Sequence, residues 1–166
     1  MYALKALSHE GVESALAKAE RYRLLNEPTE AESICLDILE IEPNNQQALI
    51  CYFLALTDRL PRDAKAFQGA LAAASRLTGE YERVYYTGIA WERRARAAHE
   101  NGGRGTRHSV HDWMVRALEY FEQAEKLRPH GNDDAVLRWN TCVRFLNGHP
   151  DVVPRSEEIP EPIVSE

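Results

Sequence analysis

The stretches Ala31-Glu-Ser-Ile-Cys-Leu-Asp-Ile-Leu-Glu-Ile-Glu-Pro43 and Ala117-Leu-Glu-Tyr-Phe-Glu-Gln-Ala-Glu-Lys-Leu-Arg-Pro129 share one frame, in which a proline follows an alanine by twelve positions. Apolar residues occupy matching offsets between the two ends, at the spacing of one face of an α-helix. Proline cannot continue a helix, so each stretch is expected to end at its proline. The frame predicts two amphipathic helices of the same kind.

Similar patterns extend along most of the chain and predict further helices. Pro28 suits the start of the helix that contains Ala31, and the pair Leu60-Pro61 marks a turn. Asn132-Asp-Asp134 offers an N-cap for a last helix. The expected helices cover about residues 11–25, 28–42, 46–59, 62–77, 81–100, 109–127 and 134–146. Short turns between them predict helical hairpins.

The segments from Tyr22 to Pro43 and from Ala117 to Pro129 resemble tetratricopeptide repeats, helix pairs of about 34 residues that stack into a solenoid. The resemblance covers residues 12–146. It implies an all-α, right-handed superhelix of about three helix pairs plus a C-terminal capping helix. Residues 1–148 would form this domain, and the acidic, proline-rich residues 149–166 would form a disordered tail.

Counting along the repeat frame reveals one irregularity, an insertion of about 17 residues between Trp91 and Ala117. It contains Asn101-Gly-Gly-Arg-Gly105, which predicts a mobile loop between two lengthened helices. Gly88 precedes the insertion, at a position where the repeat family brings two helices close together.

Composition places the chain among soluble globular domains and disfavours several partners. Most of the net charge of −6 arises in residues 149–166, so the helical body is close to neutral, which argues against binding nucleic acid or an anionic membrane. The three cysteines are far apart and lie within apolar helical patterns, as buried thiols of a reducing compartment do. We find no secretion signal and no apolar run long enough to span a membrane, and therefore expect a cytoplasmic location.

Motifs that carry catalysis do not occur in the sequence, among them the P-loop, the G-x-S-x-G elbow, the dinucleotide-binding turn and H-E-x-x-H. We therefore expect no enzyme, no catalytic residue and no cofactor. His108 and His111, which Asp112 follows, are three positions apart on a helix and could ligate one metal ion, with His99 as a third ligand. The simpler interpretation is a solvated polar turn, and no metal ligand is assigned.

The family resemblance implies a function in binding a partner peptide or helix in a concave groove, which is lined by the first helix of each pair. Transferring the groove positions of the family gives the candidate residues Glu13, Leu16, Glu20, Arg23, Ile50, Leu54, Tyr85, Ile89, Arg93 and Asn140. The alternative is that the apolar ones, Leu16, Ile50, Leu54 and Ile89, belong to the core. Leu16, Glu20, Tyr85 and Ile89 occupy the positions where one branch of the family carries a carboxylate clamp, so that clamp is absent. The expected activity is that of a non-enzymatic adaptor.

Two other functions remain open. The insertion and its approach contain a basic patch formed by Arg94, Arg96, Arg104 and Arg107, so residues 98–114 could bind an anion or a metal, or the patch could dock the acidic tail. Ordinary surface ion pairs would explain the same arginines. Alternatively, the exposed edges of a short helical array could form a homodimer.

Overall fold

Helices form nearly all of the regular structure in the computed structural model, which describes residues 2–103 and 105–155. No strand occurs in these described residues, so the expected all-α class is confirmed. The elements are a short 3-10 helix η1 (His9–Gly11) followed by α1 (Val12–Leu24), α2 (Pro28–Ile41), α3 (Gln46–Arg59), α4 (Ala66–Ser75), α5 (Glu80–Asn101), α6 (Thr106–Leu127) and α7 (Asp134–Gly148).

Local chemistry explains several of the helix ends. Pro28 is the first residue of α2, where its missing N–H costs no hydrogen bond. The side chain of Asn45 caps α3 by accepting a hydrogen bond of 2.9 Å from the backbone N–H of Ala48. Asn26 has a φ of 61° in the turn between α1 and α2, a conformation that asparagine tolerates better than most residues. These turns hold successive helices in hairpins.

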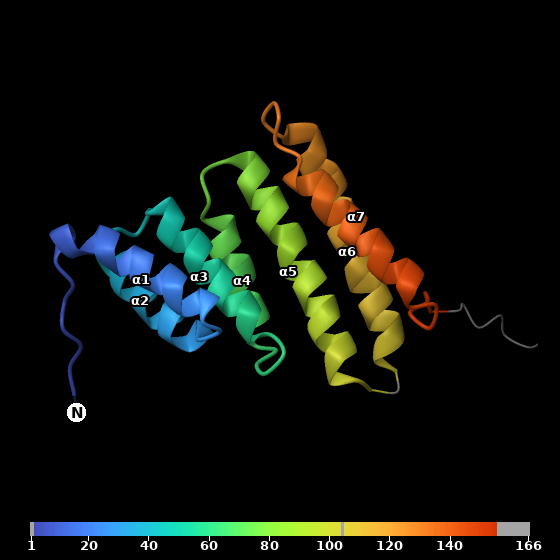
Figure 1. Cartoon of the computed structure of the whole chain (residues 1–166), viewed down its shortest axis with the longest axis horizontal. Coiled ribbons are helices and arrows are strands. Elements are labelled where there is room, and N and C mark those ends of the chain that lie inside the picture. The colour runs from blue at the N-terminus through green and yellow to red at the C-terminus, as the bar shows by residue number, and fades with distance from the viewer. Residues whose placement is uncertain (1, 104, 156–166) are drawn as a thin grey trace, which may run out of the picture.

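The helices pack in chain order. Each of α1 to α6 contacts the helix that follows it, and α1 also contacts α3, α3 contacts α5, and α5 contacts α7. In Figure 1, α1 lies in front of α2 and α7 lies in front of α6.

Two apolar clusters form most of the core. One contains residues of α1, α2 and α3, including Leu16, Ile38 and Leu49. The other extends from α3 to α7 and includes Phe53 and Phe121, both fully buried. Tyr52 and Tyr86 pack against both clusters and so join them.

The insertion proves to be mainly helical. It lengthens both α5 and α6 to 22 residues, whereas α1 to α4 have between 10 and 14. The turn between α5 and α6 is short, with positive φ angles at Gly102 and Gly105, and α6 begins at Thr106, earlier than the expected residue 109. Val110 and Met114 are fully buried, so the inserted residues extend the core.

Gly88 lies where α5 and α6 come into close contact. A Cβ atom placed on it would lie 2.8 Å from Cε1 of Phe121 and 3.1 Å from Cβ of Tyr120. These distances are shorter than ordinary carbon contacts of about 3.5–4.0 Å. The expected close approach at Gly88 is therefore confirmed.

The predicted tail, residues 149–166, is described only as far as residue 155. Val152 is 6 % exposed and packs against the larger core cluster, and the carbonyl oxygen of Val153 lies 2.9 Å from Nδ1 of His108. Residues 156–166 lie outside the described part. Among the described helices, none combines the length and apolar character needed to cross a membrane.

Candidate functional site: a groove across α1, α3 and α5

A pocket of about 310 Å³ lies between α1 and α3, and we call it the apolar pocket. Leu24 at the end of α1 is 82 % exposed there, and Ile50 and Leu54 of α3 line the same pocket. An exposed leucine beside partly buried apolar residues can contact a ligand without any change in the core. The lining residues are Glu20, Arg23, Leu24, Gln47, Ile50, Cys51 and Leu54.

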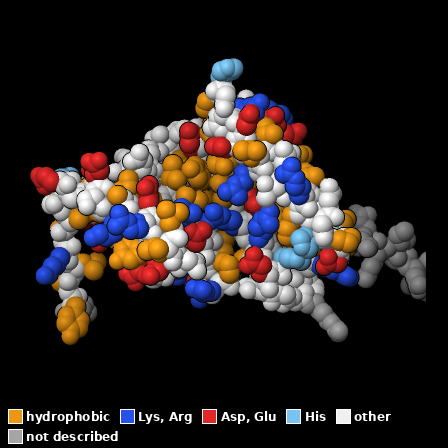
Figure 2. Space-filling model, viewed as in Figure 1, with side chains coloured by type: hydrophobic (Ala, Val, Ile, Leu, Met, Phe, Trp, Pro, Cys, Tyr) orange, Lys and Arg blue, Asp and Glu red, His pale blue; other side chains and the backbone are white. Residues whose placement is uncertain are grey.

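A second pocket of about 410 Å³ adjoins the first, and we call it the arginine pocket. Arg23 and Leu24 line both pockets, so together they form one groove across α1, α3 and α5. Figure 2 shows, in the view of Figure 1, hydrophobic side chains gathered near the middle of the molecule with lysine and arginine side chains beside them. The lining residues of the arginine pocket are Arg23, Leu24, Asn26, Thr57, Asp58, Pro61, Arg93, Arg96, Ala97 and Glu100.

Asp58 connects three helices at the centre of the arginine pocket. Its Oδ2 accepts a hydrogen bond of 2.7 Å from Nε of Arg23 on α1, and its Oδ1 accepts one of 2.5 Å from Nη1 of Arg93 on α5. The same nitrogen of Arg93 donates to Oγ1 of Thr57 at 2.7 Å. The pKa of Arg93 is lowered, mainly because burial disfavours its charge. Asp58 opposes this shift, and the nearby positive charges of Arg138 and Arg23 add to it. At this point two arginines, Arg23 and Arg93, share the single carboxylate of Asp58.

Glu92 forms a second ionic cluster between α5 and α7. It is only 1 % exposed, accepts a hydrogen bond of 3.0 Å from Nε of Arg96, and lies 3.4 Å from Nη1 of Arg138. Although desolvation opposes the charge of Arg138, Glu92 and Tyr85 raise its pKa. A buried carboxylate held by two arginines fixes the position of both guanidinium groups.

Cys51 lies in the wall of the apolar pocket and is 4 % exposed. A hydrogen bond between the two thiols, together with burial, raises the pKa of Cys35 on α2, and the same hydrogen bond lowers the pKa of Cys51. These two cysteines and Cys142 are buried free thiols.

The structure brings five of the candidate groove residues together. Glu20, Arg23, Ile50 and Leu54 line the apolar pocket, and Arg93 joins Arg23 in the arginine pocket. Their role in binding remains a prediction.

Other candidate residues lie elsewhere. Leu16 is 8 % exposed and Ile89 is 2 % exposed, and both belong to the core, so their expected position on an open groove surface is wrong. Tyr85 is half-buried in an aromatic cluster in which its ring stacks on Tyr81 at 5.5 Å between centroids. Glu13 and Asn140 are exposed and line neither pocket.

The arginines expected to form one basic patch have separate surroundings. The guanidinium carbon of Arg94 lies 4.3 Å from the ring centroid of Phe67 and 4.1 Å from that of Trp113, so this charge is held between aromatic rings. Arg96 lines the groove, whereas Arg107 lines a different pocket at the start of α6. Arg104 lies outside the described residues.

The histidines of the insertion are also separated. His108 contacts Val153, and His111 lies 3.6 Å from Asp112; the Nδ1 of His111 is buried and has no hydrogen-bond partner among the described residues. His99 packs against His149, with 4.5 Å between the ring centroids. Among the described residues, no group of three or more histidine, cysteine or acidic side chains is arranged to hold a metal ion.

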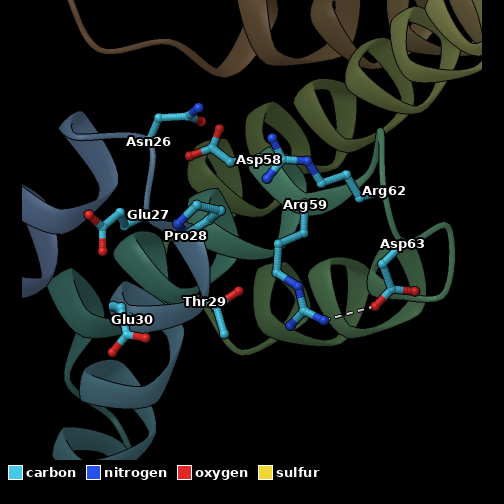
Figure 3. A pocket seen from close by; sticks show the side chains of 9 residues that line it. All are labelled: Asn26, Glu27, Pro28, Thr29, Glu30, Asp58, Arg59, Arg62 and Asp63. Atoms are coloured by element: carbon cyan, nitrogen blue, oxygen red, sulfur yellow. Dashed lines mark hydrogen bonds and ion pairs between the residues drawn. The ribbon is translucent and has the colours of Figure 1, made fainter.

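A further pocket of about 390 Å³ lies between the turn after α1 and the turn after α3 (Figure 3). Some of its charged groups already form ion pairs, because Arg59 pairs with Asp63 at 2.9 Å and also with Glu32. The pocket shares Asp58 with the arginine pocket but has no exposed apolar anchor comparable to Leu24. We therefore regard the groove as the better candidate site.

Sequence reasoning missed the partnership of Glu92 with Arg96 and Arg138. The spacing of Glu92 and Arg96 is a signal for a helical ion pair, but Arg138 is 46 positions from Glu92 and only the fold brings it near.

A comparison of the chain with protein-family models, with curated proteins and with solved structures finds no match. The resemblance to tetratricopeptide repeats therefore rests on the sequence frame alone.

Proposed function

We propose that this protein is a non-enzymatic adaptor that binds a peptide or helix of a partner protein in the groove. The proposal includes a solenoid of the tetratricopeptide type, with α1 to α6 as three helix pairs and α7 as the cap. Serial packing of the helices supports that arrangement. The three buried free thiols suit a reducing compartment, and we propose the cytoplasm.

The observation that carries the proposal is the position of Leu24. A leucine that is 82 % exposed at the rim of both pockets costs nothing to the free protein's packing and offers apolar area to a partner. Beside it, the arginine network supplies directed hydrogen-bond donors. An apolar anchor next to fixed polar groups is the arrangement that peptide-binding grooves use for affinity and orientation.

The test is a pull-down from cell lysate with the wild-type chain, with Leu24→Glu and with Leu36→Glu as the matched control. Leu36 is 49 % exposed on α2 and lines neither pocket of the groove, so the same charge is introduced elsewhere. We expect the wild type and Leu36→Glu to recover the same proteins and Leu24→Glu to lose them. Equal recovery by all three folded chains would refute the groove as the binding site.

A further inference from the structure

The arginine pocket contains two guanidinium groups that are fixed in place but only partly used. Arg23 donates to Asp58 through Nε, and Arg96 donates to Glu92 through Nε. In the described part of the chain, no hydrogen bond of the paired terminal nitrogens is found for either arginine. Each therefore retains the two-donor fork that matches a carboxylate.

Both forks are accessible from the groove. The side chain of Arg23 is 22 % exposed and that of Arg96 is 32 % exposed, and both line the arginine pocket. Packing limits the movement of Arg96, because its guanidinium carbon lies 5.0 Å from the ring centroid of Phe145. Donors that are already oriented lose little entropy when an anion binds.

An acidic residue in each pocket restricts the ligand further. Glu20 lines the apolar pocket, Glu100 lines the arginine pocket, and both are exposed. A run of acidic residues would meet repulsion from these two carboxylates, whereas a single acidic group could pair with the arginines of the pocket.

We propose that the groove binds a segment of another protein in which one internal Asp or Glu side chain lies close to a large apolar side chain. The carboxylate pairs with Arg23 and Arg96, and the apolar side chain enters the apolar pocket beside Leu24. Neutral or basic residues flank the acidic one, because they suit Glu20 and Glu100. This inference rests on the proposed function, since it presumes that the groove binds peptides.

The test is selection from a random peptide library displayed on phage, with the carboxyl end of each peptide joined to the coat protein so that only side-chain carboxylates are available. The full chain is the bait. The test variant is Arg23→Gln plus Arg96→Gln, which removes both forks but leaves Arg93 for Asp58 and Arg138 for Glu92. The matched control is Arg62→Gln plus Arg107→Gln, which removes two exposed arginines that line neither pocket of the groove.

We expect the selected peptides to share one acidic and one apolar position. Their affinity, measured by fluorescence anisotropy, should fall about tenfold or more with the test variant and remain unchanged with the control. Replacing the acidic residue of the peptide by its amide should cause a similar loss on the wild type and little further loss on the test variant.

The other outcomes separate the two proposals. Peptides that are lost with Leu24→Glu but lack an acidic position, or bind the test variant as well as the wild type, would overturn this inference and leave the proposed function standing. No enrichment over the Leu24→Glu bait would overturn both.

Discussion

Replacing Gly88 by alanine tests the packing of α5 on α6, on which the position of the groove arginines of α5 depends. The added Cβ atom would lie 2.8 Å from Cε1 and 3.0 Å from Cδ1 of Phe121. Phe121 is fully buried, and the ring of Tyr85 is 6.0 Å away between centroids, so the phenyl ring cannot retreat without moving its neighbours. Overpacking of this kind costs about 1–3 kcal/mol. Alanine recovers about 1 kcal/mol of helix propensity. We expect a net loss of about 1 kcal/mol.

Gly69→Ala is the matched control, because the same change occurs in the middle of another helix, α4. Here the new Cβ atom would lie 3.3 Å from Cδ1 and 3.8 Å from Cδ2 of Leu56, which are the ends of a flexible side chain. The helix-propensity gain should therefore dominate, and we expect a stabilisation of about 0.5–1 kcal/mol. The two substitutions should differ by about 2 kcal/mol.

Urea unfolding followed by far-UV circular dichroism measures both free energies of unfolding. A change in midpoint with a constant slope would report stability alone. Adding Phe121→Leu to Gly88→Ala should cost less than the sum of the separate substitutions, because the smaller side chain makes room for the new methyl group. If Gly88→Ala stabilises the protein as much as Gly69→Ala does, the reasoning about close helix contact is refuted.

Three further predictions concern buried or enclosed charged and phenolic groups. Glu92→Gln should lower the free energy of unfolding, measured by urea titration, by about 2 kcal/mol. This is less than the loss for a fully buried ion pair, because the arginine partners of Glu92 are a third exposed. A loss under about 0.5 kcal/mol would contradict the prediction. Arg94→Met keeps much of the aliphatic stem but removes the charge that lies between Phe67 and Trp113. It should lower the free energy of unfolding by about 1 kcal/mol and change the tryptophan emission. Unchanged stability would show that the aromatic contacts of Arg94 contribute nothing. Burial, with smaller effects from Tyr85 and other neighbours, raises the pKa of Tyr81 from 10.0 to about 12. Above pH 10 the unfolded chain therefore loses this proton before the folded chain does, and the free energy of unfolding falls until about pH 12. Unfolding measured over that range should show a smaller fall for Tyr81→Phe, and an identical fall in both proteins would contradict the shift.

Most helix bounds could be predicted from the sequence, because they depend on neighbouring residues. Pro28 at the start of α2 and Asn45 at the start of α3 act within their own helices, so a local pattern contains the required information. The insertion was harder to interpret. Its glycines predict the break, and helices on both sides of the break were expected, but the burial of Val110 and Met114 depends on contacts with other helices.

The candidate site was only partly predictable. Counting positions along the repeat assigns a residue to the correct helix but does not determine which side of that helix faces the groove and which faces the core. Ile89 therefore faces the core, whereas Arg93, one turn further along α5, reaches the groove. The links from Asp58 to Arg23 and to Arg93 each span 35 positions, and no local pattern contains that information.

The division of the core into two clusters has a consequence for motion. Because α1 and α2 pack mainly in the smaller cluster, they could open while α3 to α7 keep their own packing. Such opening would remove Arg23 and Leu24 from the groove and leave Arg93 and Arg96 in place. A ligand held by both walls would oppose it, so binding should slow amide hydrogen exchange in α1 and α2 more than in α6. Ligand binding would then stabilise α1 and α2, the part of the molecule that opens most easily.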